Sequence, residues 1–221
     1  MCGFVVAQTR LSVLVCFMSC EKKQIDTFLE LTKIKDVRRY SEYHHKIYDE
    51  SVADHCFMMI IMATKFFEEL KLDLDFVKVI KLISHHDMCE LGLVNDFDAV
   101  KVQNNKEYAR QKEQTELATI TNLSEKYGSE IMELFLEYEK QETREAKFVK
   151  ALDKIEANIH EMSRGTENFD DPEFIALYPK NAVENFPELI PFLKAFNKIM
   201  KKEYRRVGYA WKDEYDIAGK K

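Results

Sequence analysis

The sequence predicts an all-α fold, arranged as one helical bundle. Glycine and proline are scarce, with six and four in 221 residues, and this scarcity favours long helices over a turn-rich β architecture. Apolar residues recur three and four positions apart in most segments, which is the spacing of one helix face. The chain shows no internal repeat, no low-complexity run and no linker rich in Gly, Ser and Pro. One domain is therefore the economical interpretation.

Most of the expected helices show such an apolar stripe, a capping signal or both. Ser51 and Asp54 form a capping-box pattern at the start of the second helix. The helix over 106–127 is so highly charged that a solvated outer face is its simplest explanation. Segments 91–103 and 165–179 lack helical periodicity and are expected to be loops. The expected helices cover about residues 23–34, 51–70, 73–90, 106–127, 129–140, 142–163 and 182–205, the last interrupted near Pro187 and Pro191.

The composition, 46% apolar and 33% charged, is that of an ordinary soluble globular protein. The net charge of −6 argues against nucleic acid as a partner, because phosphate backbones need clustered Lys and Arg. It still allows a local basic pocket for one small phosphate. Five cysteines without a C-x-x-C pair argue against a disulfide framework and a zinc knuckle. We therefore expect free thiols in a reducing compartment, and hence a cytoplasmic location.

The first twenty residues have three competing explanations. Residues 11–18 form an apolar run after Arg10 that is too short to span a bilayer, and no other segment approaches that length, so no membrane partner is expected. The run is a weak secretion signal, a packed segment, or the result of an upstream start codon, with Met18 as the true start. The polar sequence that follows favours the last. The expected organisation is an uncertain segment over 1–20, the domain over 21–205 and a polar tail over 206–221.

The helix expected over 73–90 carries an unusual polar end. Its apolar stripe includes Val79 and Ile83, and the same spacing continues onto His86 and Asp87, then Glu90. A buried carboxylate is costly unless it is paired or bound to a metal. Either the helix simply turns polar at its end, or these groups meet partners from elsewhere in the fold.

Two further polar residues lie beside apolar stripes on other helices. His55 flanks the stripe of the helix over 51–70, and Asp153 lies on the edge of the stripe over 142–163. Taken alone, each residue has a purely structural explanation. His55 would be a core histidine with its hydrogen bonds satisfied, and Asp153 would form an ion pair with Lys150 or Lys154. The adjacent Arg38 and Arg39 could hold a phosphate, but on their own they are explained more simply as a solvated basic turn.

Together, the polar residues at the stripes of three helices form a mixed nitrogen and oxygen ligand set: His55, His86, Asp87 and Asp153. Such a set suits Mn, Co, Fe, Ni or Zn better than Mg. Four protein ligands leave coordination positions open for water and substrate, which is typical of a catalytic site. A metal there would acidify a water molecule and polarise a phosphoryl oxygen, and Glu90 is placed to orient that water or transfer its proton.

These residues carry a resemblance to a known family. The order His55, His86-Asp87, Asp153 resembles the H…HD…D pattern of the HD-domain metal-dependent phosphohydrolases. The sequence segments around these residues most resemble those of the small HD-type 5'-deoxynucleotidases, which hydrolyse deoxyribonucleoside 5'-monophosphates. The resemblance covers roughly residues 38–162. The matching segments are Ser-Val-Ala-Asp-His at 51–55, His-Asp-Met-Cys-Glu at 86–90 and Glu-Ala-Lys-Phe-Val-Lys-Ala-Leu-Asp at 145–153.

The resemblance implies a role for each matching residue. The two histidines and two aspartates would be metal ligands, and Glu90 the catalytic acid or base. Arg39 and Tyr40 match the family's phosphate-holding arginine and its aromatic near the sugar, although the spacing to the first histidine is about one residue longer, so Arg38 is the alternative. The family's second acidic residue falls at Asn95 or, one residue displaced, at Asp96, which is our candidate.

The resemblance also implies an all-helical HD domain, often a homodimer. No histidine lies between Asp87 and Asp153, so one metal per subunit is favoured. The leading hypothesis is a metal-dependent phosphomonoesterase acting on nucleoside 5'-monophosphates, with the deoxy forms as the favoured substrates. The alternatives are another HD phosphohydrolase, acting on a nucleoside polyphosphate or cyclic nucleotide, a nucleotide-binding regulatory module with weak turnover, or a purely structural cluster.

Overall fold

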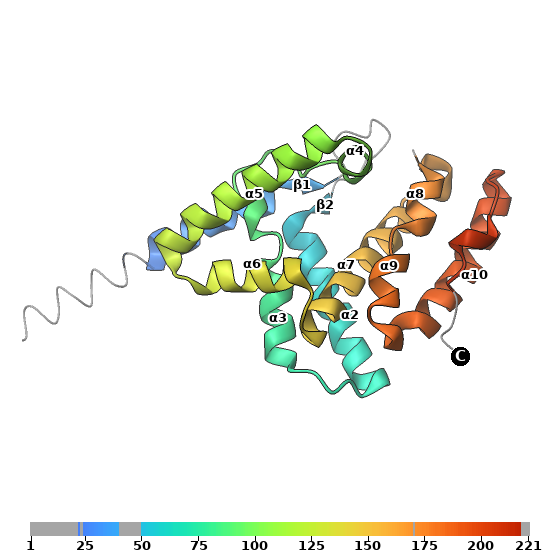
Figure 1. Cartoon of the computed structure of the whole chain (residues 1–221), viewed down its shortest axis with the longest axis horizontal. Helices are drawn as coiled ribbons and strands as arrows, with labels where there is room; N and C mark the ends of the chain where they lie inside the picture. Colours follow the sequence, from blue (N-terminus) through green and yellow to red (C-terminus); the bar gives the residue numbers. More distant parts are fainter. Residues whose placement is uncertain (1–21, 23, 40–49, 170, 218–221) are drawn as a thin grey trace, which may run out of the picture.

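Helix α7 (Arg144–Ser163) lies at the centre of the molecule in this computed structural model, which describes residues 22, 24–39, 50–169 and 171–217. In Figure 1 it runs between helices α2 and α3 and the C-terminal helices α8 to α10. It packs against α2, α3, α6 and α9. Its sequence explains this position, because a stripe of apolar residues, among them the fully buried Phe148, Leu152 and Ile155, runs along the helix.

The all-α fold class is confirmed, with one small addition. Two-residue strands β1 (Arg38–Arg39) and β2 (Glu50–Ser51) pair in antiparallel fashion. Residues 24–31 are helical and lead into η1 (Thr32–Asp36). Besides α7, the elements that follow β2 are α2 (Val52–Leu70), α3 (Phe76–His85), η2 (Met88–Glu90), α4 (Ala99–Asn104), α5 (Lys106–Tyr127), α6 (Glu130–Lys140), η3 (Thr166–Asn168), α8 (Pro172–Leu177), α9 (Lys180–Glu184), η4 (Pro187–Leu189), α10 (Ile190–Val207) and η5 (Asp213–Tyr215). None of the helices in the described residues is long and apolar enough to cross a membrane.

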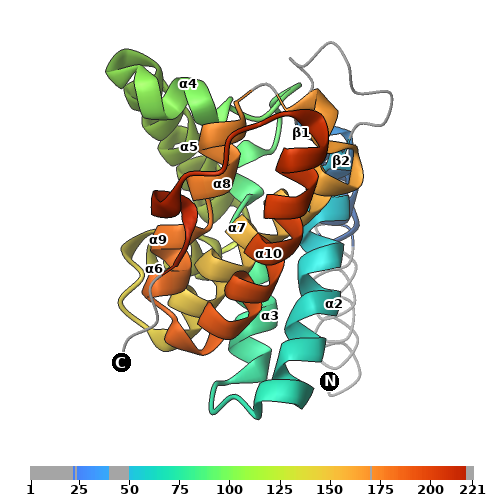
Figure 2. The same cartoon turned by 90° about the vertical axis from the view of Figure 1, so that its right-hand side faces the viewer.

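Helix α2 begins where its capping box predicts. The Ser51 hydroxyl accepts a hydrogen bond from the Asp54 backbone amide at 3.1 Å, and the Asp54 carboxylate accepts from the Ser51 amide at 3.1 Å. This cap fixes the first turn of α2, in which His55 lies. Figure 2 shows α10 beside α2, and the rings of Phe66 and Phe192 meet edge to face at 5.0 Å between centroids.

The prediction of one continuous helix over 73–90 is wrong at its C-terminal end. Helix α3 stops at His85, Asp87 leaves the helical conformation with φ −103° and ψ 13°, and a separate 3-10 turn covers Met88–Glu90. Its buried face, including Val79, Leu82 and Ile83, is a continuous apolar stripe, so packing holds the helix only up to that point. The His-Asp pair therefore lies at a helix end, where a backbone break can turn side chains into a site.

Two segments expected to be loops contain short helices. Asp98 caps α4 by accepting a hydrogen bond from the Lys101 amide at 3.0 Å, and Asp171 caps α8 by accepting from the Phe174 amide at 2.9 Å. Both capping residues precede helices of only six residues, too short for an apolar stripe to be recognised. The Asp-Pro start of α8 was a readable signal, because proline is favoured in the first turn of a helix.

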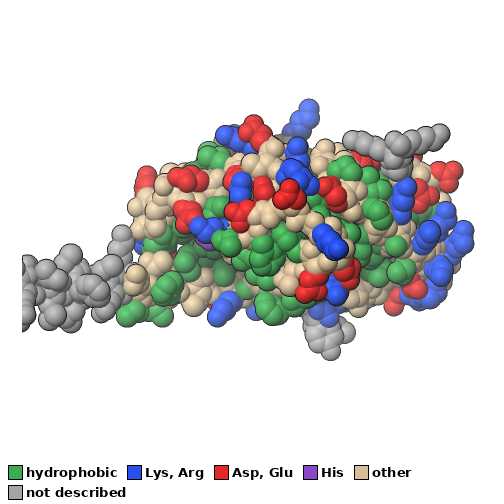
Figure 3. All heavy atoms as spheres, turned by 90° about the horizontal axis from the view of Figure 1, so that it is seen from below, with side chains coloured by type: hydrophobic (Ala, Val, Ile, Leu, Met, Phe, Trp, Pro, Cys, Tyr) green, Lys and Arg blue, Asp and Glu red, His purple; other side chains and the backbone are tan. Residues whose placement is uncertain are grey.

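The segment after α10 packs back onto the domain rather than forming a polar tail. Tyr215 and Ile217 are buried in the main hydrophobic core, and Tyr209 and Trp211 pack against it. The side-chain amide of Asn197 donates to the Tyr215 carbonyl at 3.0 Å, which holds this segment against α10. On the face seen in Figure 3, acidic and basic side chains are interspersed with apolar ones.

Candidate metal centre and active site

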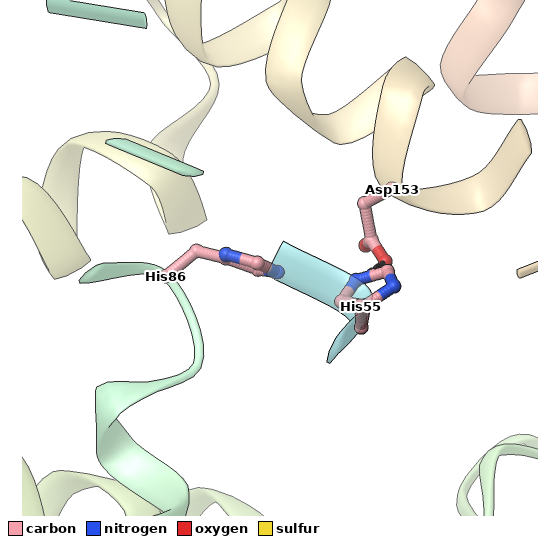
Figure 4. A group of neighbouring side chains, drawn as sticks. All are labelled: His55, His86 and Asp153. Atoms are coloured by element: carbon pink, nitrogen blue, oxygen red, sulfur yellow. Dashed lines mark ion pairs between the residues drawn. The ribbon is translucent and has the colours of Figure 1, made fainter. Parts of the chain in front are cut away.

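Three polar side chains from three different elements meet in the interior. His55 comes from the first turn of α2, His86 from the residue after α3 and Asp153 from the middle of α7, and all three are buried. Their ligand atoms lie within 4.8 Å of one another, and His55 Nε2 is 3.3 Å from Asp153 Oδ1. Figure 4 shows the ring of His86 pointing towards the His55–Asp153 pair. The two ring centroids are 5.6 Å apart.

Each imidazole is held through its other nitrogen. Nδ1 of His55 donates to the buried carboxylate of Glu156, and Nδ1 of His86 donates to the Ile83 carbonyl at 2.8 Å. Both Nε2 atoms are thereby directed into the site, and neither makes a well-directed hydrogen bond with any described residue. Buried, orphaned imidazole nitrogens beside a carboxylate are the donors that a divalent transition metal uses, so the residues fit a metal ion.

Asp87 lies beside this group rather than inside its tightest cluster. Its Oδ2 atom is 3.1 Å from His86 Nε2 and 3.2 Å from Arg39 Nη1. Arg39 also approaches Glu50, with Nε 3.5 Å from Oε2. The structure thus brings His55, His86 and Asp153 together and places Asp87 between His86 and Arg39.

The charges of the metal-free group are strongly perturbed. Burial and Arg39 both act to lower the pKa of His55, but Asp153 and Glu156 raise it to about 9. Burial would likewise lower the pKa of His86, but Asp87 raises it well above its usual value. Burial acts to raise the pKa of Asp153, yet Lys154 and His55 hold it well below its usual range. Without a metal, the site is a cluster of protonated imidazoles and ionised carboxylates.

Metal binding is therefore expected to tighten as the pH rises. A metal takes neutral imidazole, so protons on His55 and His86 must leave, and affinity should rise ~10-fold per pH unit for each proton released. Titration calorimetry with Mn²⁺ between about pH 6.5 and 8.5, in buffers of different ionisation enthalpy, measures both affinity and released protons. An affinity that does not change over this range would show that neither imidazole is a ligand.

Glu156 is expected to control how well His55 binds a metal. Its carboxylate fixes the tautomer of His55 and increases the basicity of Nε2, so Glu156→Gln should weaken Mn²⁺ binding by ~10- to 100-fold. The measurement is the Mn²⁺ affinity of folded protein. Glu161→Gln, on the same helix and also buried, is the matched control; an equal loss there would point to general damage to α7.

A cavity of about 400 Å³ opens beside the group. His86 and Asp153 contribute to its wall, so their side chains border the space that a small molecule could occupy, whereas His55 lies behind them and is not among the described residues that line it. The other predicted residues that line it are Arg39, Asp87, Glu90 and Asp96. Tyr40 lies outside the described residues.

Backbone pairing explains how Asp96 reaches the site. Arg38 in β1 forms a parallel bridge with Asn95, and the Asp96 amide donates to the Arg38 carbonyl at 2.9 Å. This pairing lays the segment after η2 along β1. Of the two arginines, Arg39 lines the cavity, whereas Arg38 is not among the described residues that do so.

Glu90 is a buried acid with a strongly raised pKa. Burial is the main cause, and the charges of Asp87 and Asp96 together with a hydrogen bond to Asp96 raise the pKa further. Its Oε2 atom is buried and has no hydrogen-bond partner among the described residues. The raised pKa favours the protonated form of Glu90, which lines the cavity and could give its proton to a ligand there.

Several residues of the site were missed or misjudged from the sequence. Lys150 and Lys154, the two candidate ion-pair partners of Asp153, both line the cavity. Lys154 does pair with Asp153, with Nζ 3.1 Å from Oδ2, and also donates to the Tyr178 hydroxyl at 2.7 Å. The Tyr138 hydroxyl donates to Asp153 Oδ2 at 2.7 Å. Glu156 had a signal, because it follows Asp153 by three positions on the same buried helix face.

Comparison with known proteins gives a consistent result. A family model described as HD domain matches residues 31–187. The chain is 36% identical over 132 residues to the 5'-deoxynucleotidase HDDC2 of Dictyostelium discoideum, covering 56% of this chain and 68% of that protein. It is 38% identical over 110 residues to HDDC2 of Xenopus laevis, covering 48% and 51%. It is 35% identical over 135 residues to the 5'-deoxynucleotidase hdd1 of Schizosaccharomyces pombe, covering 57% and 64%. The matches span about half to two thirds of the curated relatives.

Solved structures share the fold. A predicted metal-dependent phosphohydrolase from Magnetospirillum magnetotacticum superposes with a TM-score of 0.62 at 22% identity, over 86% of this chain and 95% of that one. A conserved hypothetical protein from Pyrococcus furiosus superposes with a TM-score of 0.53 at 26% identity, over 82% and 99%.

Proposed function

The chain belongs to the HD domain family, and on this premise we propose that it is a metal-dependent phosphomonoesterase for deoxyribonucleoside 5'-monophosphates. The main support for the proposal is the pair of buried, orphaned imidazole nitrogens beside Asp153, next to a cavity that is also lined by Arg39 and by Glu90, whose pKa is raised. The relatives named as 5'-deoxynucleotidases support the substrate class.

The proposed ligands are His55, His86, Asp87 and Asp153, holding one divalent metal per subunit. The HD family match and the nitrogen and oxygen donors imply a divalent ion, and the two imidazoles favour Mn, Co, Fe, Ni or Zn over Mg. When bound, the metal supplies Lewis-acid polarisation of the phosphoryl group and a water of lowered pKa.

The chain's own residues have distinct proposed roles in hydrolysis. Water forms a bond to phosphorus while the bond from phosphorus to the 5' oxygen breaks, so the leaving oxygen needs a proton. Glu90 is the proposed donor of that proton, because its buried carboxyl is held in the acid form. Arg39, fixed by Asp87 and Glu50, is proposed to hold the phosphate by charge-assisted hydrogen bonds. Asp96, which hydrogen-bonds Glu90, is proposed to accept the proton that the attacking water loses and to pass it to Glu90, which restores the acid.

Phosphate release from dAMP tests the proposal directly. We expect release with added Mn²⁺ or Co²⁺, loss on treatment with EDTA and recovery when the metal is returned. A panel that includes dATP and a cyclic nucleotide identifies the bond that breaks, and a preference for either would replace the monophosphate proposal by the other HD chemistries. Folded, metal-loaded protein that binds nucleotides without hydrolysing any of them would instead indicate a regulatory module.

A homodimer and a cytoplasmic location are also proposed. Helix α2 exposes Phe57 and Ile61, 65% and 47% accessible in this single chain, and such an apolar face is stabilised by burial against a partner. Cys56 and Cys89 are free thiols, as a reducing compartment requires. Light scattering should give the mass of two chains for the wild type and of one chain for Ile61→Glu; a monomeric wild type would contradict the proposed dimer.

A further inference from the structure

Lys150 differs from the other cations that line the cavity. Arg39 has a carboxylate oxygen of Asp87 at 3.2 Å, Lys154 has one of Asp153 at 3.1 Å, and Lys112 makes a short contact with Glu116. For Lys150, the nearest carboxylate recorded among the described residues is Glu139, with Oε1 3.6 Å from Nζ, and the Glu139 side chain is half exposed. Of these four cations, Lys150 therefore has the most distant carboxylate partner.

The same ammonium group lies close to the candidate metal centre. Lys150 precedes Asp153 by three positions on α7, and its Nζ lies 4.2 Å from the centroid of the Tyr138 ring. That tyrosine donates to Asp153 Oδ2 at 2.7 Å, and its ring centroid is 5.0 Å from that of His86. Because the Lys150 side chain is only 21% exposed, water reaches its charge poorly, and a desolvated cation with a weak partner gains most from an added anion.

We propose that Lys150 is a substrate-binding residue that holds the phosphate group, together with Arg39. Lys150 on α7 and Arg39 on β1 both line the cavity that His86 and Asp153 also line, so both cations are available to an anion held there. The phosphate carries its negative charge before, during and after hydrolysis, so Lys150 serves substrate and product alike. The identity of the phosphate as that of a nucleotide rests on the proposed function, whereas the phosphate contact itself does not.

The test is the affinity of Mn²⁺-loaded protein for inorganic phosphate, measured by calorimetry. Lys150→Met keeps the length and the packing on Tyr138 but removes the charge. We expect it to weaken phosphate binding by ~10- to 100-fold, the loss typical of a hydrogen bond to a charged group. The Mn²⁺ affinity should stay within about twofold, and Lys150→Arg should retain most of the phosphate affinity. With dAMP, KM should rise with little change in kcat, since the contact forms before the transition state.

Two matched variants separate a phosphate contact from a structural role. Lys147→Met removes a charge one turn earlier on α7, away from the cavity lining, and should leave phosphate binding unchanged. Glu139→Gln removes the carboxylate partner but keeps the Lys150 charge, so it should not weaken phosphate binding. A loss in Glu139→Gln equal to that in Lys150→Met would overturn the proposal in favour of a structural ion pair.

Two other results would also overturn it: unchanged phosphate affinity in Lys150→Met, or a parallel loss of Mn²⁺ and phosphate affinity. If wild type binds phosphate through Lys150 but releases none from dAMP, the phosphate contact stands and the proposed nucleotidase function fails.

Discussion

Asp153→Asn is expected to abolish phosphate release from dAMP and to remove measurable Mn²⁺ binding. The substitution keeps the shape of the side chain but deletes the charge that lies 3.3 Å from His55 Nε2 and 3.1 Å from Lys154 Nζ. An amide is a poor ligand beside two imidazoles, and Lys154 would lose its counter-ion. We expect a fall in kcat/KM of about 10³-fold or more, equivalent to ~4 kcal/mol of transition-state stabilisation.

The control for this variant is Asp75→Asn. Asp75 caps α3 by accepting a hydrogen bond from the Lys78 amide at 3.1 Å, and asparagine caps equally well, so turnover should not change. Direct measurement of bound Mn²⁺ in both proteins separates a lost ligand from a lost catalytic group. If Asp153→Asn kept its Mn²⁺ affinity and turned over dAMP within about tenfold of wild type, Asp153 could not be a metal ligand.

The sequence was most informative where helical periodicity acts locally. Stripes on the helices over 51–70 and 142–163 placed His55 and Asp153 at the edge of buried faces, because the facing of a side chain follows from its position in a regular helix. The capping box fixed the start of α2 for the same reason. The resemblance of the surrounding sequence segments to the HD family then indicated that these residues belong to one site.

The positions of Asp96, Glu90 and Lys150 in the site could not be predicted, because they depend on contacts between segments that are distant in the sequence. Asp96 lies beside Glu90 only because Arg38 pairs with Asn95, a contact between segments without helical periodicity. His86 keeps helical backbone angles at the end of α3, whereas the break at Asp87 redirects the chain into the turn that carries Glu90, where a continuous helix was expected. The direction of the Lys150 side chain could not be predicted, because a lysine beside an apolar stripe can extend to either side, and only the packing of α6 against α7 decides which.

Glu90→Gln is expected to lower kcat for dAMP by ~10²- to 10⁴-fold while leaving Mn²⁺ binding intact. Burial and the neighbouring Asp87 and Asp96 raise the pKa of Glu90 well above its usual value, which favours the neutral acid form. Glutamine is also neutral and has the same shape, and its amide can hydrogen-bond Asp96. The fold and the metal centre should therefore be unchanged, and the variant loses only a transferable proton.

The leaving group provides the decisive measurement for Glu90. The 5' alkoxide of a nucleoside leaves poorly without a proton, whereas p-nitrophenolate is a weak base and leaves unaided. If Glu90 protonates the leaving oxygen, Glu90→Gln should reduce hydrolysis of p-nitrophenyl phosphate by no more than ~10-fold, against the much larger loss with dAMP. Equal losses with both substrates would show that Glu90 acts on the attacking water or on substrate binding. Asp96→Asn, which keeps the Glu90 carboxyl, should cost less than Glu90→Gln with dAMP, because the proton donor remains.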